Sequence, residues 1–343
     1  MPLRSFFRRT RSAPGRPLPH GNRRRRALRI AVAAVLTIIG LLVASTAANL
    51  VLEGTERSNA VAYGEKVRID QGTINVSRSG ETGPTIVLLS GLGTPAPVLD
   101  FAPLVRELTG FRVVAVEGFG YGYSDMTARP RTIENMSEEL HTVLSTLAVD
   151  RPYILAGHSI AGFTTLYYAN KYPAEVSAVI GIDPSVPAGM ASEQDPAHTD
   201  APAAGNFWER LPSTTGLVRW AAALGLADPA GDNHTPEERE QMRMLASWNY
   251  GNGALTDETN RVAENAAKLR ALSYPGHVPV LEFLSRETIN QQPAWLGSHE
   301  RQLQHVARHE LVILDGNHYL HWTQSKAMAT KIAEFLKPAG TVP

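Results

Sequence analysis

The sequence of 343 residues contains no cysteine. A chain without cysteine has no disulfide framework, no thiolate nucleophile and no cysteine-ligated metal site. Disulfide-stabilised scaffolds, cysteine-nucleophile enzymes and proteins with cysteine-ligated metals are therefore excluded. The absence leaves the compartment open and is compatible with an exported domain. Hydrophobic residues make up 43% of the chain, which is ample for one large domain with an inserted or appended piece.

Acidic residues are absent from residues 1–29, which carry ten Arg. The remaining chain carries 23 Lys and Arg against 33 Asp and Glu, so the net charge of zero conceals a basic tail and an acidic body. The tail is rich in Arg, Pro, Gly and Ser without apolar periodicity, which predicts disorder. Because no aromatic residues interleave Arg23–Arg26 and an apolar segment follows, we expect membrane-surface charge to explain the tail, and no nucleic-acid partner.

Residues 30–52 run without a charge, and a helix of that length crosses the hydrocarbon layer of about 30 Å. The Arg cluster before it predicts a single-pass cell-membrane anchor with the N-terminus in the cytoplasm and the body outside. The alternative is a cleaved signal peptide with its cleavage site in Ala44–Ala48, which would give a secreted protein. The long basic region favours the uncleaved anchor, and residues 53–63 are expected to form a linker.

Runs of strand length alternate with helical patterns from residue 64 onward, which predicts a mostly parallel sheet with helices on both faces. Between residues 185 and 275 the strand-like runs vanish, and Thr235-Pro236-Glu237-Glu238 is a strong helix start. We therefore expect an α/β core over residues 64–184 and 276–337, with a helical cap over residues 185–275. The expected strands are 66–70, 73–78, 85–89, 111–116, 153–156, 176–182, 278–284 and 310–314.

The stretch Gly157–Gly162 follows one of these strands and precedes a helix. Strand, Gly, Ser, small residue and helix is the order of a nucleophile elbow, whose sharp turn lifts the serine out of the sheet. A serine hydroxyl becomes a nucleophile when a base takes its proton. Ser159 is thus a candidate nucleophile, although Ala161 stands where the second glycine of the motif is expected and Gly162 comes one residue later.

Three further loops lie at the ends of expected strands, in a fixed order along the chain. They are Ser90-Gly91-Leu92-Gly93, the stretch Glu117 to Ser124, and Gly316 to His321. Together with the elbow, these stretches resemble the oxyanion loop, the Asp-x-x-Gly-x-Gly-x-Ser loop and the histidine loop of the α/β-hydrolase superfamily, in its serine-nucleophile branch. The resemblance covers about residues 64–337, with Glu117 replacing the Asp of the family pattern.

The resemblance implies Ser159 as nucleophile and His318 as general base. The backbone amides of Leu92 and Ile160 would hold the oxyanion. The family places its acid after the sixth or seventh strand; we expect Glu287, the acidic residue of the loop after the seventh, in preference to Asp183 after the sixth. No cofactor and no metal are expected.

The sequence thus predicts a membrane-anchored, extracytoplasmic serine hydrolase that cleaves an ester, amide or thioester of a small-molecule acyl substrate through an acyl-enzyme. An acyltransferase or a peptidase would use the same residues, and a catalytically inactive binding protein would keep the same fold. Replacement of Ser159 by Ala separates the catalytic hypotheses from the binding protein.

Overall fold

The computed structural model describes residues 20–126, 128–187, 207–226 and 228–337. Its strands are β1 (Glu65–Ile69), β2 (Gly72–Ser79), β3 (Thr85–Leu89), β4 (Arg112–Glu117), β5 (Tyr153–His158), β6 (Val176–Ile182), β7 (Val280–Ser285) and β8 (His309–Leu314). Each expected strand is present, and its ends differ from the expected ends by no more than two residues.

The eight strands form one sheet in the order β1-β2-β4-β3-β5-β6-β7-β8. β1 and β2 are antiparallel to their neighbours, and every pair from β4 to β8 is parallel. The register pairs Leu89 with Gly157, Gly157 with Gly181, and Ile182 with Phe283. The loops that follow β3, β5, β6 and β7 therefore meet at one edge of the sheet, where ligands of α/β proteins bind.

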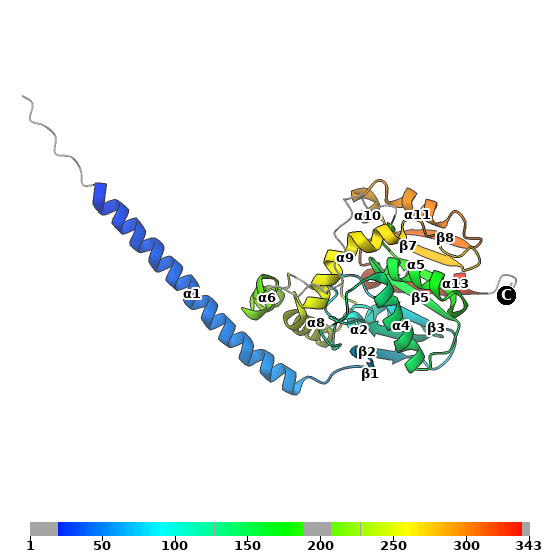
Figure 1. The fold of residues 1–343 in the computed structure, drawn as a ribbon, viewed down its shortest axis with the longest axis horizontal. Helices are drawn as coiled ribbons and strands as arrows, with labels where there is room; N and C mark the ends of the chain where they lie inside the picture. Colours follow the sequence, from blue (N-terminus) through cyan, green and yellow to red (C-terminus); the bar gives the residue numbers. More distant parts are fainter. Residues whose placement is uncertain (1–19, 127, 188–206, 227, 338–343) are drawn as a thin grey trace, which may run out of the picture.

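Helices cover both faces of the sheet (Figure 1). The helices of the core are α2 (Pro97–Asp100), α3 (Ala102–Glu107), α4 (Ile133–Thr146), α5 (Ala161–Lys171), the 3₁₀ turn η1 (Pro173–Glu175), α10 (Arg286–Gln291), α11 (Trp295–Leu303), α12 (Leu320–Thr323) and α13 (Ser325–Leu336).

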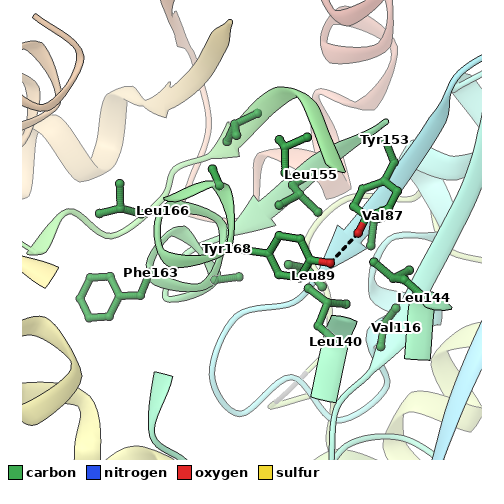
Figure 2. Close-up of a cluster of buried hydrophobic side chains, with 14 of the residues drawn as sticks. Val87, Leu89, Val116, Leu140, Leu144, Tyr153, Leu155, Phe163, Leu166 and Tyr168 are labelled. Atoms are coloured by element: carbon green, nitrogen blue, oxygen red, sulfur yellow. Dashed lines mark hydrogen bonds between the residues drawn. The ribbon is translucent and has the colours of Figure 1, made fainter. Parts of the chain in front are cut away.

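Two buried clusters result from the alternation of side chains along the strands. Val87 and Leu89 of β3 belong to the cluster with α4 and α5, whereas Ile86 and Leu88 belong to the cluster with α3 and α13. Strands that are apolar on both faces are typical of a covered parallel sheet. Figure 2 shows Val87 and Leu89 with side chains of α4 and α5, including Leu140, Leu144, Phe163 and Leu166.

A polar contact closes the end of this cluster that is remote from the elbow. Tyr153 of β5 and Tyr168 of α5 hydrogen-bond to each other, as Figure 2 shows. Both hydroxyl oxygens also lie within hydrogen-bond distance of Glu175, at 2.6 and 2.8 Å, so the two phenol hydrogens are shared among three oxygens. Because the phenols are paired with a carboxylate, they are buried without loss of their hydrogen bonds. The strand and the helix that flank the elbow are thus tied together at their far ends.

The segment between β6 and β7 is helical where it is described, with α6 (Phe207–Thr214), α7 (Leu217–Ala223), α8 (Pro236–Asn249) and α9 (Gly253–Leu269). The expected start at Thr235 is confirmed: its side chain accepts from the amide of Glu238, and Glu238 accepts from the amide of Thr235. Residues 188–206 of the expected cap lie outside the described residues.

The N-terminal helix α1 (His20–Asn59) is longer than the apolar run 30–52. Residues 20–29, expected to be disordered, and residues 53–59, expected to be linker, continue the helix, and both expectations are corrected. Contact with the cap stabilises the extension of α1 beyond residue 52, because Arg219 of α7 pairs with Glu56. Among the described residues, α1 is the one helix long and apolar enough to cross a membrane by length and composition, and it projects from the body in Figure 1.

Candidate active site

Ser159 occupies a strained turn between β5 and α5. Its φ is +54°, a left-handed conformation that non-glycine residues adopt rarely and that is frequent at active sites. A Cβ on Gly162 would lie 2.8 Å from the carbonyl oxygen of Ser185, which is too close for any side chain. The close approach that requires glycine therefore falls at Gly162, and Ala161 is tolerated at the preceding position.

His318 contacts Asp183. The Nδ1 of His318 lies 2.7 Å from Oδ2 of Asp183, which follows β6 and has a fully buried carboxylate. Asp183 also accepts from the amide of Ser285 and from Nε1 of Trp295, each at 3.0 Å, and from the hydroxyl of Thr288. Four donors thus fix the carboxylate, and the carboxylate fixes the ring of His318 with its proton on Nδ1.

The preference for Glu287 is corrected by this geometry. The side chain of Ser285 accepts from the amide of Thr288 and so begins α10 directly at the end of β7. Glu287 falls in the first turn of that helix, where it is exposed and accepts a hydrogen bond from Gln291 at 2.9 Å. The carboxylate that contacts His318 is Asp183.

Ser159 and His318 line the same cavity, which has a volume of about 460 Å³. The elbow and the histidine loop are 159 positions apart in the sequence, yet the parallel sheet brings them to one edge. The other lining residues are Ser185, Val186, Thr288, Gln291, Gln292 and Trp295. A hydroxyl and an imidazole that is held by a carboxylate thus face one cavity.

The loop after β3 lies directly against the elbow. A Cβ on Gly91 would lie 2.9 Å from Nδ1 of His158 and 3.1 Å from Cβ of Ser159. Among the described residues, the backbone amides of Leu92 and Ile160 donate to no backbone or side-chain acceptor of the protein, whereas the amide of Gly93 donates to the hydroxyl of Tyr121. Two amides close to the serine are therefore left with hydrogens available for an external oxygen.

A buried cluster lies behind the site, and two of its members, Asp100 and Trp322, were not predicted from the sequence. Nε2 of His158 donates to the carbonyl oxygen of His318 at 3.2 Å, which joins the elbow to the histidine loop. Nε2 of His321 donates to Asp100 at 2.8 Å, and Nε1 of Trp322 donates to the same carboxylate at 2.9 Å. The signal in the sequence is four aromatic or imidazole residues, His318, Tyr319, His321 and Trp322, within five positions after Asn317.

Burial lowers the pKa of His158 well below 6.5, and the neighbouring His321 and His318 lower the pKa further. His158 is therefore neutral at pH 7. One ligand atom each from Asp100, His158 and His321 lie within 4.8 Å of one another, a set that suits a metal ion by residue type. The hydrogen bond between His321 and Asp100 already compensates the buried carboxylate.

Glu117, which replaces the family aspartate, is fully buried and organises the loop that ends at Ser124. Its carboxylate accepts from the hydroxyl of Tyr63 at 2.6 Å, from Nδ2 of Asn75 at 3.0 Å and from the amide of Tyr123 at 2.8 Å. Burial raises the pKa of Glu117, although these hydrogen bonds oppose the shift. The loop therefore has a structural role in shaping the edge of the site.

A larger cavity of about 670 Å³ separates the core from the cap. On the core side it is lined by Gly93 and Thr94 of the loop after β3 and by Tyr319, the residue after His318. On the cap side it is lined by mostly apolar residues of α7 and α8, including Leu217, Val218, Ala221, Ala222, Met242 and Ala246. An apolar space next to the loop after β3 and the histidine loop suits the apolar part of a substrate.

Comparisons with known proteins agree with this geometry. The family model described as alpha/beta hydrolase fold matches residues 84–266. The match covers more than half of the chain, so the chain belongs to the α/β-hydrolase fold family.

Individual relatives match part of the chain. The uncharacterized protein YbdG of Bacillus subtilis (strain 168) is 34% identical over 125 residues, which are 36% of this chain and 38% of the relative. The 2-(acetamidomethylene)succinate hydrolase of Mesorhizobium japonicum is 32% identical over 119 residues, 34% of this chain and 41% of the relative. The chain thus spans about two fifths of these relatives.

A solved structure shares the fold. The enol-lactonase of Burkholderia xenovorans LB400 superposes with a TM-score of 0.54 at 20% identity, over 79% of this chain and 99% of that chain. This likeness is one of fold, and it agrees with the family model.

Proposed function

We propose that the protein is a serine hydrolase that cleaves an ester, amide or thioester through an acyl-enzyme formed on Ser159. The observation that carries the proposal is the Asp183–His318 pair at 2.7 Å, because His318 lines the cavity that Ser159 also lines. A serine at the elbow is the residue type that attacks a carbonyl carbon once a base accepts its proton.

In the first half of the reaction, Nε2 of His318 takes the proton of the Ser159 hydroxyl as Oγ bonds to the carbonyl carbon. The carbonyl oxygen becomes an oxyanion, which the amides of Leu92 and Ile160 stabilise. Asp183 holds the imidazolium that forms, because its buried carboxylate already contacts Nδ1. The imidazolium then protonates the leaving alcohol, amine or thiol, and the acyl group remains on Ser159.

In the second half, a water molecule gives one proton to Nε2 of His318 and its oxygen bonds to the acyl carbon. The tetrahedral intermediate collapses, Oγ of Ser159 leaves and recovers the proton from His318, and the acid is released. Atoms and charges balance without a cofactor. An acyltransferase would replace this water by an acceptor alcohol or amine.

Labelling by a fluorophosphonate tests the nucleophile. We expect the probe to modify Ser159 in the full chain and to leave the Ser159→Ala variant unmodified. Turnover of a chromogenic ester should fall by several orders of magnitude in the same variant, with an unchanged far-UV circular dichroism spectrum. Equal turnover by the two proteins would refute a serine mechanism and would leave a non-catalytic member of the family.

We also propose that α1 anchors the hydrolase in the cell membrane with its body outside the cytoplasm. The support is the helix of residues 20–59, its uncharged run 30–52 and the Arg residues that precede this run. Protease added to intact cells should digest the body, and carbonate extraction should leave the full-length chain in the membrane. Release of a chain that begins after residue 48 would instead support a cleaved signal peptide.

A further inference from the structure

The cap carries an exposed apolar face on α7 and the turn that follows it. Leu217, Trp220 and Leu224 recur at the spacing of one helix face, and Leu224 and the nearby Leu226 are 78% and 76% exposed. Scattered exposed leucines are ordinary, but a contiguous face of large apolar residues marks an interaction surface. We refer to Leu217, Trp220, Leu224 and Leu226 as the α7 face.

The α7 face is fastened to the apolar helix α1. Nε1 of Trp220 donates to the hydroxyl of Ser45 at 2.7 Å, and that hydroxyl donates to the carbonyl oxygen of Thr215. Asn49, one turn further along α1, is fully buried and donates to the carbonyl oxygen of Ser213. Ser45 and Asn49, two of the polar residues in the apolar run of α1, thus bind the cap.

The level of this contact along α1 decides where the cap lies relative to a bilayer. The uncharged residues 30–44 span about 22 Å as a helix. A hydrocarbon layer of about 30 Å that begins at residue 30 therefore ends near Asn49, and the contacts of Ser45 and Asn49 with the cap fall in its last two turns. Beyond the contact, Leu50, Val51 and Leu52 remain exposed. Exposed apolar residues on both elements, at this end of the hydrocarbon layer, form a surface that suits the boundary between headgroups and acyl chains.

α7 and the turn that follows it also line the cavity of about 670 Å³. Val218, Ala221 and Ala222 line it, together with Leu217 and Leu226 of the α7 face. The same helix therefore contributes residues both to an exposed apolar surface and to the apolar space that reaches the loop after β3 and the histidine loop.

We propose that the α7 face lies in the interface of the lipid bilayer, and that the cavity behind it takes the acyl chain of a membrane-dissolved ester. This inference rests on the proposed hydrolase function and anchor. The structure favours the bilayer as the occupant because the α7 face lies against α1, which is itself an apolar helix long enough to span the bilayer. Trp208 and Trp220, which are 73% and 40% exposed, are residues enriched at the edge of the hydrocarbon layer.

The depth of the α7 face can be measured directly because the chain has no cysteine. The variant Leu224→Cys carries a nitroxide label at the α7 face, and Glu334→Cys carries the same label near the end of α13, on the far side of the body from α1. Both full-length chains are reconstituted in phosphatidylcholine vesicles. We expect oxygen, which concentrates in the acyl chains, to relax the label at position 224, and a water-soluble nickel complex to relax the label at position 334. The ratio of the two effects should place position 224 about 5–10 Å below the membrane surface.

Turnover supplies the second arm. A long-chain 4-methylumbelliferyl ester dissolved in the vesicles and the soluble acetate ester are compared for wild type and Leu224→Glu. Leu224 does not line the cavity, so the substitution acts at the bilayer contact. We expect the ratio of long-chain to acetate turnover to fall about tenfold, since the charge expels the α7 face from the apolar layer.

The outcomes separate the two proposals. Failure to hydrolyse either ester, with no fluorophosphonate labelling of Ser159, refutes the hydrolase function, while the label depths still test the membrane contact. Normal acetate turnover with the label at position 224 as accessible to the nickel complex as that at position 334 refutes the membrane contact alone. If the label at position 224 is already immobile in the absence of lipid, the α7 face is covered by protein, and the membrane contact is refuted in favour of a protein partner.

Discussion

The substitution Asp183→Asn tests the identity of the acid most sharply. Oδ1 of Asp183 accepts from the amide of Ser285 and from Nε1 of Trp295, and Oδ2 accepts from Thr288 and His318. An Asn amide keeps one acceptor oxygen, which must take the Oδ1 place because its two partners there only donate, whereas the hydroxyl of Thr288 can rotate to accept. The amide nitrogen then faces Nδ1 of His318.

An N–H that points at Nδ1 leaves the proton of the neutral imidazole on Nε2. Such a ring presents an N–H to Ser159 where the mechanism needs a lone pair, so it cannot accept the hydroxyl proton. In the serine-protease triad, the same change of tautomer lowers kcat by about 10⁴-fold, which corresponds to about 5 kcal/mol in the barrier. We expect a loss of this size in Asp183→Asn, with little change in KM because the substituted side chain does not line the cavity.

The assay is the steady-state hydrolysis of a soluble acetate ester by the full chain in detergent, with the thermal midpoint as a check on folding. The matched control is Glu287→Gln, which keeps the length of the side chain and an acceptor for Gln291. Its kcat should stay within about twofold of wild type, because an exposed residue away from the reacting atoms has little effect. A folded Asp183→Asn protein with kcat near that of wild type, or an equal loss in Glu287→Gln, would refute the assignment.

Three further predictions follow from the geometry. Gly91→Ala places a methyl group against His158 and Ser159, and we expect kcat for the acetate ester to fall at least about tenfold while the urea midpoint changes little; an unchanged kcat would contradict the close approach. Gly122→Ala places a Cβ 1.9 Å from the Glu117 carboxylate and should lower the free energy of unfolding by about 3 kcal/mol or more. In the control Gly110→Ala, the glycine also has a positive φ but its Cβ would meet no atom within 4 Å, so the free energy of unfolding should fall by about 1–2 kcal/mol. Similar losses in the two variants would contradict the clash. The pKa of His158 is lower in the folded state than its ordinary value of 6.5, so its contribution to stability is complete above pH 6.5 and is lost as the pH falls below that value. Urea titrations at several pH values should show that the free energy of unfolding falls less steeply with falling pH in His158→Gln than in wild type. An identical dependence on pH in the two proteins would exclude His158 as the source.

The sequence predicted the order of elements because each signal is local. Continuous apolar runs such as Thr85–Leu89 and Val176–Ile182 are typical of strands buried on both faces, and the observed strands lie within two residues of the expected ones. The elbow was equally readable, since Gly157 and Gly162 are needed by contacts with chain neighbours a few residues away or in the next strand. Membership of the hydrolase family follows from these local patterns in their order.

The acid was not readable from the sequence. Ile182 and Phe283 are paired in the sheet, so Asp183 and Glu287 both follow strands that end at the same edge. Which of them faces His318 depends on the start of α10, where Ser285 turns Glu287 outward while its own amide, with Thr288 and Trp295, supplies donors to Asp183. Those donors come from residues more than a hundred positions away from Asp183, and no local pattern contains them.

The extent of α1 and its contact with the cap were decided in the same way. Composition alone indicated an apolar run with Ser45 and Asn49 as polar interruptions, and only the folded chain shows that their partners lie in α6, α7 and the turn between them. What the sequence determined is the set of local conformations and the residue types that carry chemistry. What the tertiary structure decided is which of those residues meet, because hydrogen bonds and ion pairs form between groups close in space, whatever their separation along the chain.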